Sequence, residues 1–158
     1  MMTIDAIYNA VAFAETGGEA SPWIRTRVRP PQGSTAYGPV QLTALKAGDY
    51  MDRYFHVLSP FLNFFAVFAA QGHKFRRWGG VDGIPPEMQK YNYGGAGDVG
   101  ASEQDRREYA RFCKAVMQID LYAVDYNLGR FIERWRGVSE SEDTGYFQKV
   151  KDHFYKEA

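Results

Sequence analysis

The side chain best placed to do chemistry in this sequence is one carboxylate, Glu15, which is followed directly by Thr16, Gly17 and Gly18. Glycines just past a helical stretch usually mark its C-terminus, so Glu15 is expected in the last helical turn. A carboxylate is unfavourable there because the helix end carries partial negative charge, and a partly dry site would then raise its pKa. Glu15 is therefore a candidate general acid. The alternative is a surface residue at a fraying helix end.

Other chemistries lack their signatures in this chain. No Gly-rich phosphate loop or Gly-x-Ser-x-Gly elbow is present, and the histidines show no metal-binding spacing. The formal net charge of +0 argues against a nucleic-acid binder that relies on phosphate neutralisation. The single cysteine, Cys113, lies in a helical pattern and is predicted to be a buried small hydrophobe. Carboxylate chemistry remains, and aromatic residues, 16% of the chain, favour a sugar cleft.

The helix that bears Glu15 follows from the apolar pattern before it. Apolar side chains recur at three-to-four spacing from Ile4 to Ala14, which predicts an amphipathic helix. Thr3 or Asp5 is placed to cap its first turn.

A small β element is predicted next. Trp23–Val28 alternates, which predicts a strand, and a proline-glycine turn leads to a partner strand over Thr35–Val40. Its arginines, Arg25, Arg27 and Arg29, share one face. They either form a solvated face or recognise carboxylates on an anionic substrate.

The rest of the chain is predicted to be helical. The helices are expected over Leu42–Phe55, Ser59–Gln71, Glu87–Asn92, Ser102–Met117, Asp120–Trp135 and Tyr146–Tyr155, with a break between the fourth and fifth and a polar linker over Ser139–Thr144. The apolar stretch Leu58–Ala70 is the expected central buried helix and is too short to span a bilayer. The 158 residues therefore predict an α+β, predominantly α-helical single domain with a small β-hairpin near the N-terminus.

Three segments in order resemble the motifs of the soluble lytic transglycosylase family, relatives of goose-type lysozyme. They are Glu15-Thr16, then Ser34-Thr35-Ala36-Tyr37-Gly38-Pro39-Val40-Gln41-Leu42, then Tyr91-Asn92-Tyr93-Gly94-Gly95-Ala96-Gly97. The family pattern is Glu-Ser, then Gly-Leu-Met-Gln, then Ala-Tyr-Asn-x-Gly. This chain departs from it with Thr16 for Ser, Pro39-Val40 for Leu-Met and Lys90 for Ala. The resemblance covers roughly residues 5–99.

The resemblance implies a lysozyme-like fold that cleaves the β-1,4 bond between N-acetylmuramic acid and N-acetylglucosamine. Residues 1–158 would form one catalytic domain, with the motifs in 5–99 and a helical completion in 100–158. Glu15 would be the general acid. The substrate-binding residues would be Gln41, Tyr91, Asn92, Thr35 and Tyr37, with Tyr91 positioning Glu15. No cofactor and no metal are implied.

The second acid of a glycosidase has no motif in this chain. A hydrolase needs a second carboxylate as nucleophile or base, yet the predicted hairpin, Trp23–Gln41, contains neither Asp nor Glu. The remaining candidates are Glu19, Asp49, Asp52 and Asp98. A single acid suits a lytic transglycosylase, in which Glu15 acts first as acid and then as base while the muramoyl 6-hydroxyl attacks. We therefore favour the lyase, with a hydrolytic muramidase as the alternative.

Partners and location are also expectations from the resemblance. The expected partners are peptidoglycan glycan strands, with no nucleic acid and no stable membrane insertion. The N-terminus shows no signal peptide. A compact muralytic protein of this kind is similar to bacteriophage endolysins, cytoplasmic until release to the cell wall, or to lysins carried in a phage virion. Two hypotheses from other classes are a non-catalytic wall-binding or structural module that keeps the lysozyme-like cleft, and a helical adaptor without a sugar site.

Overall fold

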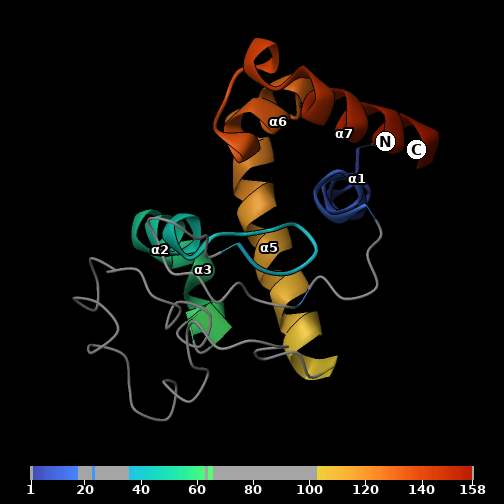
Figure 1. The fold of residues 1–158 in the computed structure, drawn as a ribbon. Helices are drawn as coiled ribbons and strands as arrows, with labels where there is room; N and C mark the ends of the chain where they lie inside the picture. Colours follow the sequence, from blue (N-terminus) through green and yellow to red (C-terminus); the bar gives the residue numbers. More distant parts are fainter. Residues whose placement is uncertain (1, 18–22, 24–35, 63, 66–102, 158) are drawn as a thin grey trace, which may run out of the picture.

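The computed structural model describes residues 2–17, 23, 36–62, 64–65 and 103–157, and these are predominantly helical (Figure 1). The elements are α1 (Ile4–Thr16), α2 (Ala44–Arg53), α3 (Phe55–Leu58), the 3-10 helix η1 (Ser59–Phe61), α5 (Glu103–Ala123), α6 (Leu128–Arg136), the 3-10 helix η4 (Glu140–Glu142) and α7 (Thr144–Glu157). Figure 1 shows α1 and α7 to the right of the long α5, α6 at its upper end, and α2 and α3 to its left. Over the described residues, no helix has both the length and the apolarity needed to cross a bilayer.

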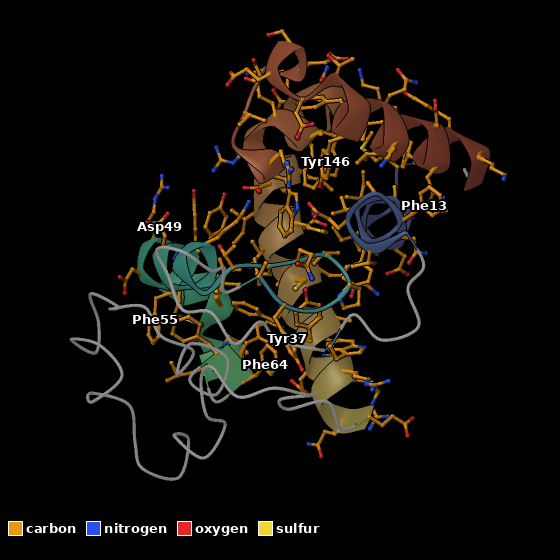
Figure 2. The ribbon with its side chains drawn as sticks, viewed as in Figure 1. Phe13, Tyr37, Asp49, Phe55, Phe64 and Tyr146 are labelled. Carbon is orange, nitrogen blue, oxygen red and sulfur yellow. The ribbon has the colours of Figure 1, made fainter. Side chains whose placement is uncertain are left out.

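Helix α1 confirms the first prediction. The Thr3 hydroxyl accepts a hydrogen bond from the backbone N–H of Ala6 at 3.2 Å, which satisfies one of the free donors of the first turn. Gly17 ends the helix in the left-handed region, with φ of 58°, and its N–H donates to the Phe13 carbonyl at 2.8 Å. The Phe13 ring stacks on His153 of α7, with ring centroids 4.5 Å apart (Figure 2). Glu15 is thereby fixed in the last turn of a helix that packs against α7.

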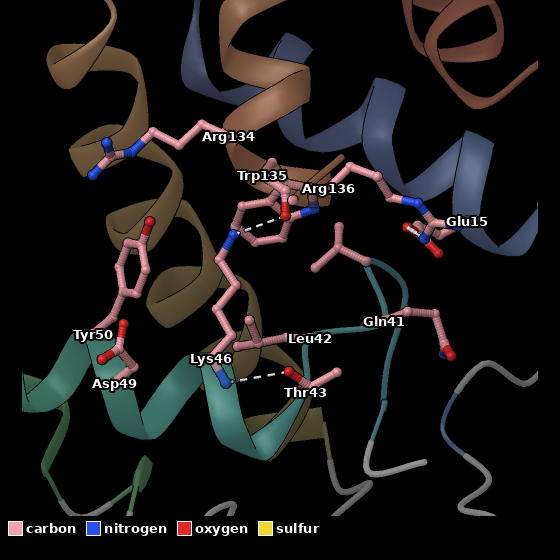
Figure 3. A pocket seen from close by; sticks show the side chains of 12 residues that line it. Glu15, Gln41, Leu42, Thr43, Lys46, Asp49, Tyr50, Arg134, Trp135 and Arg136 are labelled. Carbon is pink, nitrogen blue, oxygen red and sulfur yellow. Dashed lines mark hydrogen bonds and ion pairs between the residues drawn. The ribbon is translucent and has the colours of Figure 1, made fainter. Parts of the chain in front are cut away.

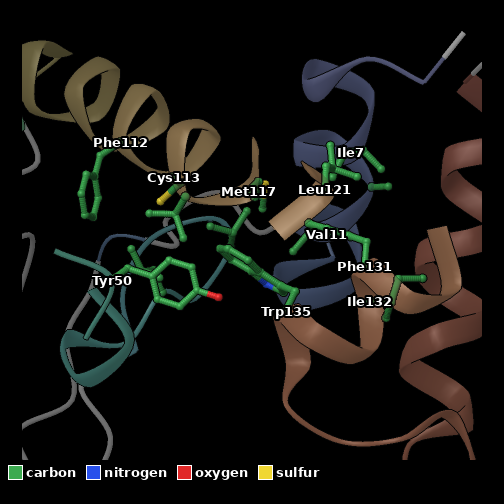
Figure 4. Close-up of a cluster of buried hydrophobic side chains, with 14 of the residues drawn as sticks. Ile7, Val11, Tyr50, Phe112, Cys113, Met117, Leu121, Phe131, Ile132 and Trp135 are labelled. Carbon is green, nitrogen blue, oxygen red and sulfur yellow. The ribbon is translucent and has the colours of Figure 1, made fainter. Parts of the chain in front are cut away.

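Helix α5 forms the centre of the described fold. Its buried face includes Phe112, Cys113 and Met117, which are fully buried (Figure 4). The predicted burial of Cys113 is confirmed. The Leu58–Ala70 stretch, expected to be the central helix, is described only in part, through Phe65 and without Asn63. Among the described residues, α5 rather than this stretch lies at the centre.

The predicted break between Met117 and Asp120 is wrong, because α5 continues through both residues to Ala123. Both side chains face the core and are fully buried, so the helix is retained by tertiary packing. The chain turns instead through Asp125 and Tyr126, whose φ angles are 51° and 59°. The Asn127 side chain then accepts from the Arg130 N–H at 2.9 Å and starts α6.

The start of α2 and both ends of the last helix lie within two residues of their predicted positions. Thr43 caps α2 as expected, accepting from the Lys46 N–H at 3.2 Å. The last helix was predicted over Tyr146–Tyr155 and forms α7, which is longer at both ends. The predicted polar linker before it contains η4, closed by a capping box between Ser139 and Glu142.

Most of the predicted hairpin lies outside the described residues, including the three arginines and Thr35. In its described end, the expected partner strand is absent, and an isolated antiparallel bridge joins Tyr37 to Leu42. The chain reverses between them in a tight turn, with φ of 81° at Gly38 and 51° at Gln41. The Gln41 N–H donates to the Gly38 carbonyl at 3.0 Å. A strand cannot extend through such a turn, so this segment is a compact loop.

Candidate functional site

A pocket of about 570 Å³ opens between the C-terminal end of α1, the loop at residues 40–43, helix α2 and the C-terminal end of α6 (Figure 3). Its lining residues are Glu15, Val40, Gln41, Leu42, Thr43, Lys46, Asp49, Tyr50, Arg134, Trp135, Arg136 and Gly137. Two residues predicted to act together, Glu15 and Gln41, therefore line the same pocket.

Glu15 is largely buried in the pocket wall, with 13% of its side chain exposed, and its Oε1 accepts from Arg136 Nη1 at 3.2 Å. Burial raises the pKa of Glu15 above its usual range, and the charge of Asp143 adds to this. The Tyr146 hydroxyl and the Arg136 guanidinium act in the opposite direction and lower that pKa. Because burial is the largest cause, the carboxyl retains its proton to higher pH than an exposed glutamate does.

Arg136 connects Glu15 to the C-terminal helices. Its Nε donates to Asp143 at 3.0 Å, and its guanidinium lies 4.5 Å from the centre of the Tyr146 ring. The buried Tyr146 hydroxyl faces this cluster, and within the described residues it makes no hydrogen bond of ordinary geometry. Sequence reasoning missed Arg136 and Tyr146. The sequence did contain Gly137, a glycine typical of a helix C-terminus, and its left-handed φ of 82° ends α6 beside the acid.

Thr16 ties the acid-bearing helix to the loop. Its hydroxyl contacts two carbonyl oxygens, that of Ala12 at 2.8 Å and that of Pro39 at 3.3 Å. The Gln41 side chain donates from Nε2 to the Gly38 carbonyl at 3.0 Å, so it stabilises the same turn. The residue beside the acid thus positions the loop that brings Gln41 to the pocket.

The loop in turn rests on α5. The Tyr109 hydroxyl donates to the Tyr37 carbonyl at 2.6 Å. A Cβ at Gly38 would lie 2.3 Å from Tyr109 Cζ, so only glycine permits this close approach. Tyr37 itself is 4% exposed and packs edge-on against Trp23, with ring centroids 5.6 Å apart. Tyr37 therefore supports the loop from the core, and it is not among the residues that line the pocket.

The far end of the pocket is built on a buried carboxylate, Asp120. Its Oδ1 accepts from Arg134 Nε at 2.7 Å and from the Tyr50 hydroxyl. Lys46 Nζ lies 3.5 Å from Oδ2 as an ion pair without hydrogen-bond geometry. Burial lowers the pKa of Lys46, whereas Asp120 acts to raise it. The ammonium also donates to the Trp135 carbonyl at 2.9 Å and lies 4.0 Å from that ring centre.

One of the candidate second carboxylates, Asp49, lines the same pocket as Glu15. Its carboxylate is 37% exposed and pairs with Arg53 at 3.3 Å. Asp52 lies on the same helix but does not line the pocket. The other residues predicted for the site are outside the described residues: Thr35, Tyr91, Asn92, Glu19 and Asp98.

A buried acid with a raised pKa beside an open pocket can donate a proton to a bound leaving group. Within the described ranges, no group of three or more His, Cys, Asp and Glu side chains is arranged to hold a metal ion. Comparison with protein-family models, with curated proteins and with solved structures finds no match to this chain.

Proposed function

We propose that this protein cleaves the β-1,4 bond between N-acetylmuramic acid and N-acetylglucosamine in peptidoglycan, with Glu15 as the acid. The observation that carries the proposal is the shared pocket of Glu15 and Gln41, which come from two of the three segments that resemble the lytic transglycosylase motifs. The raised pKa of Glu15 supports it, because a general acid must be protonated near neutral pH.

In the proposed reaction, the Glu15 carboxyl protonates the leaving glycosidic oxygen. The resulting carboxylate then accepts the proton of the muramoyl 6-hydroxyl, whose oxygen attacks the anomeric carbon and forms a 1,6-anhydro product. Both the protonated and the ionised form of this one residue must therefore be accessible during the reaction. Burial favours the protonated form of Glu15, and Arg136 at 3.2 Å favours the ionised form. This opposition suits a group that acts first as acid and then as base.

A hydrolytic muramidase is the second candidate, and it is favoured by the presence of Asp49 in the same pocket. In such an enzyme Asp49 would supply the nucleophile or activate a water molecule. Product masses separate the two candidates, since an anhydro end is lighter than a reducing end by one water. Asp49→Asn should leave a lyase active and should inactivate a hydrolase that depends on this carboxylate.

The test of Glu15 is lysis of purified peptidoglycan. Glu15→Gln should reduce the rate by at least about a hundredfold, as loss of a general acid typically does. The matched control is Glu133→Gln, since Glu133 is exposed on α6 and does not line this pocket. Near-normal turnover by the Glu15 variant would refute the assignment. Binding of glycan strands without cleavage by the unmodified protein would favour a non-catalytic wall-binding module instead.

The proposal also includes a fold type and a biological role. We propose that the domain has a lysozyme-like arrangement. The biological role would be cell-wall lysis by a phage endolysin or a virion-associated lysin. A search for activity in phage particles and in lysates of the producing cell would separate these two settings.

A further inference from the structure

The end of the pocket farthest from Glu15 is positively charged. Lys46 and Arg134 share one buried carboxylate, Asp120, so among the described residues one of their two positive charges has no carboxylate to balance it there. Figure 3 shows the Arg134 guanidinium and Glu15 at opposite ends, with Lys46 between them in this view. Asp49 also lines the pocket, but its charge is offset by Arg53 at 3.3 Å. An arriving anion would therefore restore the charge balance at this end.

These cations also retain hydrogen-bond donors. Arg134 uses Nε for Asp120 and Nη2 for the Tyr54 hydroxyl at 3.1 Å, out of the five N–H donors of a guanidinium. Lys46 donates to the Trp135 carbonyl at 2.9 Å, out of three ammonium donors. The side chains of Lys46 and Arg134 remain 20% and 32% exposed. A ligand can thus reach donors whose positions are already fixed by Asp120, which reduces the entropy lost on binding.

We infer that Lys46 and Arg134 form a subsite for a carboxylate of the substrate. This rests on the proposed function. In a peptidoglycan strand the N-acetylated sugars contribute hydroxyls and amides, whereas the peptide stems on the muramoyl units carry free carboxylates. A guanidinium presents a planar pair of donors that matches a carboxylate. The inference therefore assigns to the subsite a stem carboxylate of the muramoyl unit, and the protein prefers strands whose stems are intact and ionised.

The first test changes the ligand and leaves the protein unmodified. Soluble glycan strands are prepared with free stem carboxylates and, from the same batch, with these carboxylates converted to primary amides. The free form should be cleaved with a kcat/KM about tenfold to a hundredfold higher, mainly through a lower KM, as expected for a charge-assisted hydrogen bond. Titration calorimetry with the Glu15→Gln variant measures the same preference as binding, without cleavage.

The second test changes the protein. Arg134→Gln should remove most of the preference for the free form, and Arg134→Lys should retain part of it because the charge is kept without the planar fork. Arg130→Gln is the matched control, since Arg130 is exposed on the same helix and does not line this pocket. Thermal melts report whether the Arg134 variants fold. If these variants do not fold, the comparison of free and amidated strands on the unmodified protein tests the subsite.

The outcomes distinguish this inference from the proposed function. Equal binding of free and amidated strands overturns the carboxylate subsite, and cleavage of both forms would still support the glycosidase. Preferential binding of the free form without cleavage of either supports the subsite and overturns the glycosidase. Neither binding nor cleavage of either form overturns both. A preference that Arg134→Gln leaves unchanged in a folded variant also overturns the subsite.

Discussion

Asp120→Asn should strongly destabilise the described fold. The carboxylate is buried and contacts Lys46, Tyr50 and Arg134. An amide of the same shape cannot balance the two cations, and its nitrogen would face their donors. Removing one partner of a buried ion pair typically costs about 3–5 kcal/mol. Because both cations are partly exposed, we expect about 3 kcal/mol.

That free energy corresponds to a measurable fall in melting temperature. For a chain of this length, each kcal/mol lowers Tm by about 2–4 °C, so Asp120→Asn should lower it by roughly 6–12 °C. The control is Asp5→Asn, because Asp5 is 73% exposed and its pair with Lys114, at 2.9 Å, is worth less than about 1 kcal/mol. Differential scanning calorimetry of both variants at one pH makes the comparison.

The reasoning is refuted if the two variants melt within about 2 °C of each other, because Asp120 would then behave as a surface carboxylate. A double variant adds a second check. Lys46→Met removes one of the cations that Asp120 balances, so its effect should be smaller in the Asp120→Asn background than in the unmodified protein. Strict additivity would mean that the two side chains do not interact.

Three further predictions concern the pocket. Burial raises the pKa of Glu15, so the protonated carboxyl contributes to stability fully below the unfolded pKa of about 4.3, and this contribution is lost as pH rises through the folded pKa. Because Glu15→Gln stays neutral at every pH, its Tm relative to that of the unmodified protein should rise between pH 4 and pH 8. Gly38→Ala should lower the free energy of unfolding by about 1–3 kcal/mol in urea, because its Cβ meets Tyr109 at φ of 81°, whereas Gly145→Ala meets no neighbour and should be near neutral. Arg136→Met removes a charge that lowers the pKa of Glu15, so the alkaline limb of the pH–rate profile should move to higher pH, and an unchanged limb would exclude this coupling.

Local sequence patterns predicted those features of the site that depend on residues close in the sequence. Glu15 and its helix end follow from apolar spacing and from Gly17, and Thr43 follows from its capping chemistry. Such features are settled by hydrogen bonds within one or two turns. The helix break was misplaced, because α5 continues through Asp120 to Ala123. The burial of Asp120 is made possible by partners on α2 and α6, which periodicity does not reveal.

The partners of Glu15 could not be predicted for the same reason. Arg136 and Tyr146 lie in a segment that matches no motif, and they reach the acid only when α7 packs against α1 and α6 packs against α7. The three arginines of the predicted hairpin were expected either on a solvated face or as ligands of substrate carboxylates, and they lie outside the described residues; the described cations at the pocket are Lys46, Arg134 and Arg136. Long-range packing, rather than local propensity, selects which cations line the pocket.

The contact between Tyr109 and the loop has a consequence for the order of folding. The hydrogen bond to the Tyr37 carbonyl joins residues 72 positions apart, and that between Glu15 and Arg136 joins residues 121 apart. Contacts of such separation are slow to form, because closing a long loop costs chain entropy before the contact stabilises it. During synthesis from the N-terminus, α1 and its acid emerge well before α5 supplies the support for the loop. A nascent chain therefore carries Glu15 long before it has a pocket in which that acid can act.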